Sequence, residues 1–311
     1  MSWIIVALLA YFLLAIANLG DKFLVDNILK SSKAYAFVVC FLGLIVFVSA
    51  PWFLNWPGTP LFIFNLVNGA IFSIALWLLY EALIKGEASR ILVFIGGLTP
   101  IFSFIFSFFV FKEKFSSSEL LGILIILFGV FLIAFLPSER SLLKRIFSWL
   151  GLKDQSKRAG IKVALLSSVF YSLYFIGTKI AYNYQSFASS FLWTRLGAFI
   201  FALLFLLKAF DRKEVIKMFR KSEPKKSKFL VLLNQVIGSS GFILQNYAIF
   251  LGSVVLVNAL QGFQYALILI ISASLSLFAP KLLREKFSRR IIIQKSAAVF
   301  LIAVGIYFLT F

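Results

Sequence analysis

Long apolar runs separated by short polar segments dominate this chain. Most runs hold roughly 20 residues, about the length that an α-helix needs to cross the hydrocarbon core of a bilayer. The pattern predicts ten transmembrane helices, over Ser2–Gly20, Ala34–Leu54, Leu61–Leu83, Ile91–Phe111, Leu120–Leu136, Ile161–Ile180, Phe187–Leu207, Phe229–Leu251, Val254–Phe278 and Ile291–Phe311. The first run lacks the basic start of a cleaved signal peptide, so we expect it to be retained as a helix.

Two short motifs occur once in each half of the chain. Lys112-Glu113-Lys114-Phe115-Ser116 is nearly repeated as Arg284-Glu285-Lys286-Phe287-Ser288, and Gly20-Asp21-Lys22 is echoed by Gly177-Thr178-Lys179. These matches predict two five-helix repeats, residues 1–136 and 161–311, joined by a basic linker, residues 137–160. Because five is an odd number, the second repeat enters the membrane inverted, which is typical of transporters with a binding site near the midplane, where the halves meet.

Composition excludes several classes of protein. With 61% hydrophobic residues, 18% aromatic residues and a mean hydropathy of +0.99, the chain is predicted to be an all-α integral membrane protein. The absence of histidine removes the commonest metal ligand and general base, and a single cysteine, Cys40, leaves no internal disulfide. We therefore expect no metal, cofactor or catalytic residue. No P-loop sequence is present, so ATP is not expected to be the direct energy source.

The net charge of +19 is concentrated in the loops. Loops after odd-numbered helices hold 27 Lys and Arg residues, and loops after even-numbered helices hold 2. The positive-inside rule then predicts that the odd loops are cytoplasmic and that both termini lie outside the cytoplasm, in the plasma (inner) membrane. We expect the basic face to contact anionic lipid headgroups rather than nucleic acid. Nothing in the sequence indicates an oligomeric state.

The linker has a helical period of its own. Its apolar residues are Leu142, Leu143, Ile146, Phe147 and Leu150, and they alternate with Arg140, Lys144 and Arg145. This spacing predicts a short amphipathic helix on the cytoplasmic leaflet. A solvated connector is the alternative. The basic segment from Lys208 to Lys228 is interpreted as an orientation signal, in which Pro224 interrupts any long helix.

A series of short motifs resembles the drug/metabolite transporter superfamily, in its ten-helix EamA-type branch. The motifs are Ala88-Ser89-Arg90-Ile91-Leu92-Val93, Gly97-Leu98-Thr99-Pro100, Phe111-Lys112-Glu113-Lys114-Phe115, Leu121-Gly122 and Phe128-Gly129-Val130, in that order. The second half departs from the pattern, because Gln261-Gly262-Phe263-Gln264 replaces the Thr-Pro pair. The resemblance implies a ten-helix bundle that carries small organic solutes across the inner membrane, without identifying the solute.

Arg195 is the strongest site candidate. It lies eight residues into its run, about 12 Å from the predicted outer boundary, where a guanidinium costs about 2.5 to 3.5 kcal/mol. We expect it to face water or protein, and to bind a carboxylate or phosphate bidentately. The structural alternative is that it hydrogen-bonds carbonyls at a broken helix.

Other polar and aromatic residues within the runs are candidates for lining a substrate path. They are Trp193, Tyr171, Tyr174, Asn258, Gln261, Tyr265, Trp77 and Tyr80. For the amides, helix–helix adhesion is the alternative, worth roughly 0.6 to 2 kcal/mol for each hydrogen bond. Pro100, after Gly97, predicts a kink that serves gating or is simply tolerated.

Two function classes remain open. The first is a secondary transporter of a small organic metabolite, with amino acids as one candidate, working by alternating access. The second is a lipid-handling membrane protein, such as a flippase for a lipid-linked headgroup. An enzyme is disfavoured because no Asp or Glu is expected near the centre of any run; Asp21 and Lys22 are expected near the cytoplasmic end of the first helix.

Overall fold

The computed structural model describes residues 2–27, 31–85, 88–134, 155–219, 225–278 and 289–310. All of the regular structure in these ranges is helical. The amphipathic helix expected in the linker and the second Arg-Glu-Lys-Phe-Ser string lie outside the described residues. Within the described ranges, seven helices are long and apolar enough to cross a membrane, and three further apolar stretches are shorter, over Ser117–Leu132, Val254–Ile268 and Ser296–Phe308.

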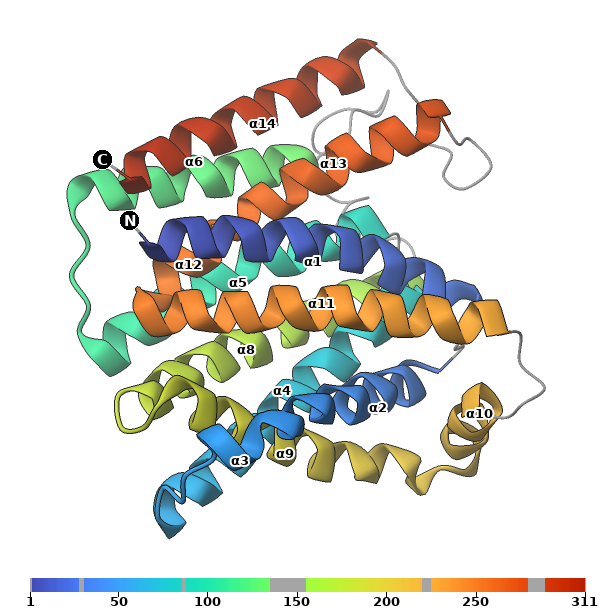
Figure 1. Cartoon of the computed structure of the whole chain (residues 1–311). Helices are drawn as coiled ribbons and strands as arrows, with labels where there is room; N and C mark the ends of the chain where they lie inside the picture. Colours follow the sequence, from blue (N-terminus) through green and yellow to red (C-terminus); the bar gives the residue numbers. More distant parts are fainter. Residues whose placement is uncertain are drawn as a thin grey trace.

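The helices follow the apolar runs closely (Figure 1). The first half contains α1 (Ser2–Asn27), α2 (Ser32–Leu42), a 3₁₀ segment η1 (Gly43–Ser49), α3 (Ala50–Phe53), α4 (Thr59–Lys85), α5 (Ala88–Phe111) and α6 (Ser117–Ala134). The second contains α8 (Gln155–Tyr182), α9 (Phe187–Ala202), a 3₁₀ segment η2 (Leu203–Leu207), α10 (Ala209–Phe219), α11 (Lys225–Leu251), α12 (Val254–Ala259), α13 (Gln261–Phe278) and α14 (Arg289–Thr310).

Three elements differ from the sequence prediction. α1 was expected to end at Gly20 but continues to Asn27, because hydropathy marks where a helix leaves the hydrocarbon and not where its hydrogen bonding ends. The single run Val254–Phe278 is split at Leu260 into α12 and α13. The segment interpreted only as an orientation signal begins with an 11-residue helix, α10, and the Ser31 hydroxyl before α2 donates to Asp211 of α10 at 2.5 Å.

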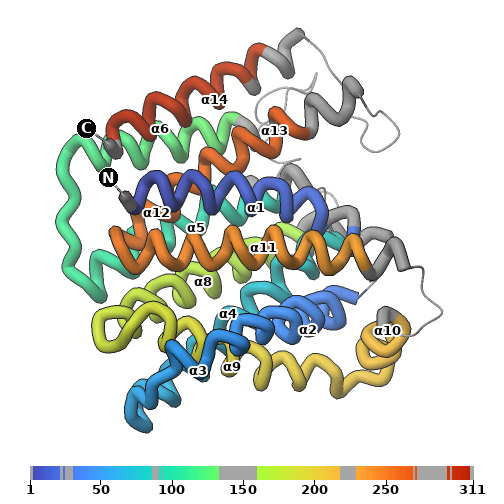
Figure 2. The backbone as a smooth tube through the Cα atoms, viewed as in Figure 1, coloured from blue at the N-terminus to red at the C-terminus, as the bar shows by residue number. Residues whose placement is uncertain are grey.

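Helices of one half pack mainly against helices of the other. α1 lies along α11, α4 along α8 and α6 along α14, and the colours of the tube in Figure 2 show that the two helices of each pair come from different halves of the sequence. α1 begins and α14 ends at the same end of the bundle (Figure 1). The core therefore forms between the halves.

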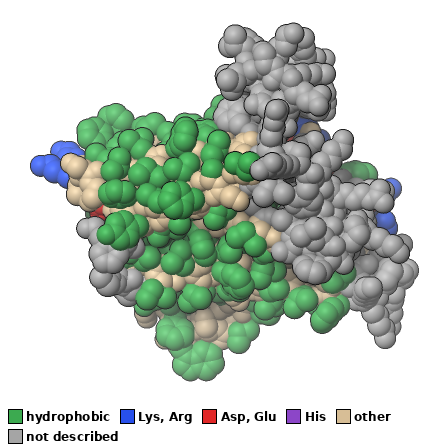
Figure 3. All heavy atoms as spheres, turned by 90° about the horizontal axis from the view of Figure 1, so that it is seen from above, with side chains coloured by type: hydrophobic (Ala, Val, Ile, Leu, Met, Phe, Trp, Pro, Cys, Tyr) green, Lys and Arg blue, Asp and Glu red, His purple; other side chains and the backbone are tan. Residues whose placement is uncertain are grey.

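Apolar side chains cover much of the outside. Leu9 of α1, Phe128 of α6 and Val236 of α11 are 54%, 62% and 60% exposed. In Figure 3 hydrophobic side chains dominate the described part of the visible face, whereas Lys and Arg lie at its edges. Such a surface is stable in lipid and would aggregate in water. The chain is a multi-pass membrane protein.

Candidate binding cavity

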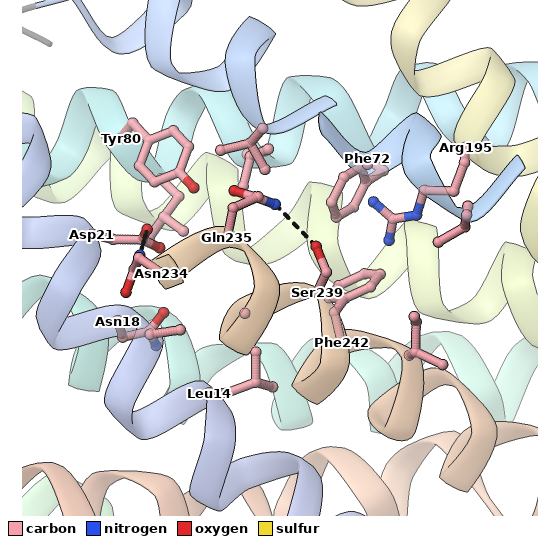
Figure 4. Close-up of a pocket in the computed structure, with 18 of the residues that line it drawn as sticks. Leu14, Asn18, Asp21, Phe72, Tyr80, Arg195, Asn234, Gln235, Ser239 and Phe242 are labelled. Carbon is pink, nitrogen blue, oxygen red and sulfur yellow. Dashed lines mark hydrogen bonds between the residues drawn. The ribbon is translucent and has the colours of Figure 1, made fainter. Parts of the chain in front are cut away.

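A cavity of about 100 Å³ lies between the two halves of the bundle. Its walls come from α1, α2, η1 and α4 of the first half and from α8, α9 and α11 of the second. The lining combines aliphatic and aromatic side chains with a few polar groups, as small-molecule sites do. One end holds Asp21 and Asn234 together with Asn18 and Tyr80, and the other end holds Arg195 (Figure 4).

Arg195 is buried, with 7% of its surface exposed. Its guanidinium carbon lies 4.5 Å from the ring centre of Phe72, 4.8 Å from Phe191 and 4.3 Å from Phe242. Cation–π contacts of this kind are worth about 2 kcal/mol or more when desolvated, which offsets the cost of placing the charge in the bundle. Rings stack on the faces of the guanidinium, whereas its N–H donors lie in the plane, so this packing is compatible with an anion at the edge.

No carboxylate of the described residues lies within ion-pair distance of Arg195. Elsewhere on α4, Glu81 and Lys85 form an ion pair at 2.7 Å. Arg195 also lies beside the break between α2 and η1, because a Cβ on Gly43 would be 3.8 Å from its Nη1. The structural alternative, hydrogen bonds from Arg195 to carbonyls at a broken helix, stays a prediction.

The opposite end of the cavity is built around Asp21. The Tyr35 hydroxyl donates to Asp21 Oδ1 at 2.5 Å, and Asn234 Nδ2 donates to the same oxygen at 2.7 Å. Tyr35 also packs edge-on against Tyr80, with ring centres 4.5 Å apart. Asp21 therefore lies inside the bundle. α1 continues six residues beyond Asp21, but its apolar span ends at Asp21 itself, which agrees with the expectation that Asp21 lies near the end of the first run.

The structure brings several predicted residues to this cavity and leaves others outside it. Tyr80, Tyr171 and Arg195 line the cavity. Tyr174 lies directly behind the lining, with its ring centre 5.0 Å from that of Phe72, and its hydroxyl donates to Asn246 Oδ1 at 2.9 Å. Two aromatic candidates lie farther away.

Trp193 belongs to an aromatic cluster at the end of α4, where its ring centre is 5.0 Å from that of Phe62 and its Nε1 donates to the Asn55 carbonyl at 2.9 Å. Trp77 packs against Phe205, with 5.8 Å between ring centres, and Lys33 Nζ lies 4.6 Å from its ring centre. Neither side chain lines the cavity.

The residues predicted from the ninth run contact α5 instead of the cavity. Asn258 Nδ2 donates to Ser103 Oγ at 2.9 Å, and the Tyr265 ring occupies the space that Gly96 leaves free. The side-chain oxygens of Asn258 and Gln261 have no partner among the described residues. α5 is helical on both sides of Pro100, and Gly97 lies beside Val130 of α6.

Gln235 and Ser239 were not singled out from the sequence, although they line the cavity. Gln235 Nε2 donates to Ser239 Oγ at 3.1 Å, one turn along α11 (Figure 4). The sequence contained a signal for this stripe, because Asn234, Gly238 and Gly241 follow helical spacing in an apolar run. That signal also fits simple helix adhesion.

The comparisons with known proteins agree with this architecture. A solved structure described as "Crystal structure of protein" superposes with a TM-score of 0.64, covering 98% of this chain and 94% of that chain at 14% sequence identity. That likeness concerns the fold alone. No curated protein matches the chain. Residues 1–135 match the EamA-like transporter family, which belongs to the drug/metabolite transporter superfamily, so the resemblance expected from the sequence is confirmed.

Proposed function

We propose that this protein is a secondary transporter that moves a small organic metabolite across the plasma membrane by alternating access of two inverted five-helix repeats. Proteins of the EamA-like family are membrane transporters of small solutes. The observation that carries the proposal is the cavity between the halves, with a buried Arg195 that no described carboxylate neutralises.

The pairing of helices supports the inverted repeat. If α2–α3 and α12–α13 are each counted as one helix and α10 is left aside, the described part of each half has five helices. The first helix of one half packs on the third of the other in both directions, as α1 on α11 and α8 on α4. The fourth helix of each half packs on the first helix of the other half, as α5 on α8 and α13 on α1. The fifth helices, α6 and α14, pack on each other.

One pairing breaks this exchange symmetry. α4 and α9 are in backbone contact, since a Cβ on Gly197 would lie 2.5 Å from Leu66 Cα and a Cβ on Gly69 would meet Thr194 and Ala198. Their counterparts under exchange, α11 and α2, instead form opposite walls of the cavity. A transporter with inverted repeats alternates by exchanging the conformations of its halves. The closed α4–α9 crossing and the open α2–α11 side are the two conformations that such an exchange requires.

Transport can be tested by counterflow of labelled solutes in proteoliposomes, with labelled lipid analogues in parallel. We expect movement of an anionic or dipolar solute. Arg195→Lys keeps the charge but loses the planar fork, so we expect weaker substrate binding with near-normal folded yield. Unchanged binding in Arg195→Lys, or in Arg195→Gln with the fold preserved, would exclude Arg195 as the anion clamp. Movement of lipid without solute would reject the transporter proposal.

The charge distribution supports an orientation with both termini outside the cytoplasm. In that orientation, the cavity side lined by Asp21 and Asn234 is nearer the cytoplasm, and the α4–α9 crossing closes the outer side. A reporter that is active only in the cytoplasm should stay silent when it is fused after Phe311. A strong signal would reverse the assignment.

A further inference from the structure

We infer that the transported solute is dipolar and elongated, with an anionic group bound at Arg195 and a cationic group bound at Asp21. This inference rests on the proposed transport function and narrows its substrate class. It favours ω-amino acids and similar solutes, whose opposite charges are separated by several methylene groups, over solutes whose charges are adjacent.

Asp21 is built to receive a cation. Its Oδ1 accepts hydrogen bonds from Tyr35 and Asn234, which stabilise the ionised carboxylate, and neither of these bonds uses Oδ2. Among the described side chains, no Lys or Arg lies within ion-pair distance of it. A carboxylate inside a helical bundle is costly without a compensating partner, and the cavity is where a solute could supply one.

The separation of the two charges follows from helix geometry. Along α11, Asn234 contacts Asp21 and Phe242 contacts Arg195, and these residues are eight positions apart. Along α4, Tyr80 lies at the Asp21 end and Phe72 lies under Arg195, again eight positions apart. Eight residues of α-helix rise about 12 Å. Two independent helices therefore place the two charged ends of the cavity about 12 Å apart. Figure 4 shows Asp21 at one end of the site and Arg195 at the other.

This separation selects the length of the solute. Allowing about 3 Å for a hydrogen bond at each end leaves about 6 Å between the charged groups of the ligand. In an α-amino acid, two bonds separate the amino nitrogen from the carboxyl carbon, which places them only about 2.5 Å apart. An extended chain advances about 3.6 Å per three bonds, so about five bonds, or four methylene groups, are needed.

The wall between the two ends fits such a chain. Leu14 and Ala17 of α1 and Leu76 and Leu79 of α4 supply apolar surface there, and Gly238 of α11 leaves room beside Ala17. Gln235 already donates one amide hydrogen to Ser239, so this donor does not need a polar group of the solute. A methylene chain gains about 0.8 kcal/mol for each buried CH₂ group, so the middle of the cavity favours an apolar spacer.

The test measures binding of the series from glycine to 8-aminooctanoate to the purified full-length protein, by calorimetry and thermal stabilisation. Hexanoate and hexylammonium serve as probes with a single charge. We expect the tightest binding near 5-aminopentanoate or 6-aminohexanoate, at least tenfold tighter than glycine and either singly charged probe. Asp21→Asn should remove this advantage while leaving hexanoate binding unchanged, and Asp211→Asn on α10 is the matched control.

Asp21→Glu gives a second readout that does not depend on losing a charge. Its longer side chain reaches further into the cavity, so the optimum should move to a ligand shorter by one methylene group. Binding without a length optimum, or an optimum that stays fixed in Asp21→Glu, would overturn the inference. The inference would also be overturned if Asp21→Asn kept the chain-length preference but lost the pH dependence of transport. Asp21 would then carry protons and would not bind the cationic group of the solute.

Counterflow separates the inference from the transporter proposal. If labelled monocarboxylates move and ω-amino acids neither bind nor move, transport stands and the dipolar substrate is rejected. If ω-amino acids bind in an Asp21-dependent way but none of the labelled solutes moves in counterflow, the inference of a dipolar ligand is kept and the transporter proposal is rejected.

Discussion

Arg195, which is buried, and Lys179, which is partly exposed, are stabilised in different ways in this bundle. Arg195 is surrounded by three aromatic rings from three helices. Lys179 instead donates to the carbonyls of Ile249, Phe250 and Gly252 at 2.9, 3.2 and 2.8 Å, at the end of α11. The last carbonyls of a helix have no intrahelical partner and carry partial negative charge, so an ammonium group stabilises them. Lys179 is therefore a structural residue, whereas Arg195 is the proposed anion site.

Replacing Lys179 with Met should lower thermal stability without changing ligand specificity. Hydrogen bonds to a charged group are worth about 1.5–3 kcal/mol, and the variant leaves three carbonyls without this donor. The midpoint of thermal unfolding in detergent should fall by several degrees. Lys208→Met, at an exposed position after η2, is the control and should change little. Equal midpoints for the two variants would contradict this role for Lys179.

At the scale of helices, the closest crossing depends on two glycines. Gly69 of α4 and Gly197 of α9 allow the two backbones to touch. The Ser73 hydroxyl then donates to the Ala198 carbonyl at 2.7 Å, across the same crossing. Small residues at helix contacts are the usual means of close packing in membranes, where lipid leaves little hydrophobic force to join helices.

Gly197→Ala should destabilise this crossing. In an isolated helix the change would be favourable by about 0.5–1 kcal/mol, but overpacking costs typically 1–3 kcal/mol, and here the obstacle is backbone that cannot rotate away. We expect reduced folded yield and a lower unfolding midpoint. Gly43→Ala is the control, because its Cβ would lie 3.8 Å from Arg195 atoms in ordinary contact. A Gly197→Ala protein as stable as Gly43→Ala would show that the crossing can relax.

The sequence predicted helix positions well and helix ends less well. The predicted runs ending at Phe111 and Leu251 end where α5 and α11 end. The sequence missed the C-terminal end of α1, because hydropathy does not show that helical hydrogen bonds continue beyond the apolar run. It also missed the split between α12 and α13, because hydropathy does not show where helical hydrogen bonds break within the bundle. Arg195 could be found because a charge stands out in an apolar run. Asp21 was set aside as a residue near the helix end, since its place in the cavity depends on side chains of α2, α4 and α11 that meet it there.

At the scale of the whole molecule, the asymmetric pairing gives a test of motion. Asn65 of α4 lies beside α9, where Ser190 and Thr194 donate to its Oδ1 at 3.2 and 3.4 Å. The proposed exchange requires this contact to open during each cycle. Cysteines at Asn65 and Ser190, in a Cys40→Ser background, should form a disulfide that stops counterflow when oxidised and releases it when reduced. Each single-cysteine variant is the control, and unimpaired counterflow in the oxidised protein would show that the contact stays closed.

The 3₁₀ segments have a mechanical consequence. η1 and η2 follow α2 and α9, which are the second helices of the two halves. A 3₁₀ turn rises about 2.0 Å per residue and an α turn 1.5 Å, so converting the seven residues of η1 would shorten that helix by about 3.5 Å. The five residues of η2 would give about 2.5 Å. A change of pitch inside the second helices would therefore draw the segments that flank η1 and η2 closer together along the helix axis.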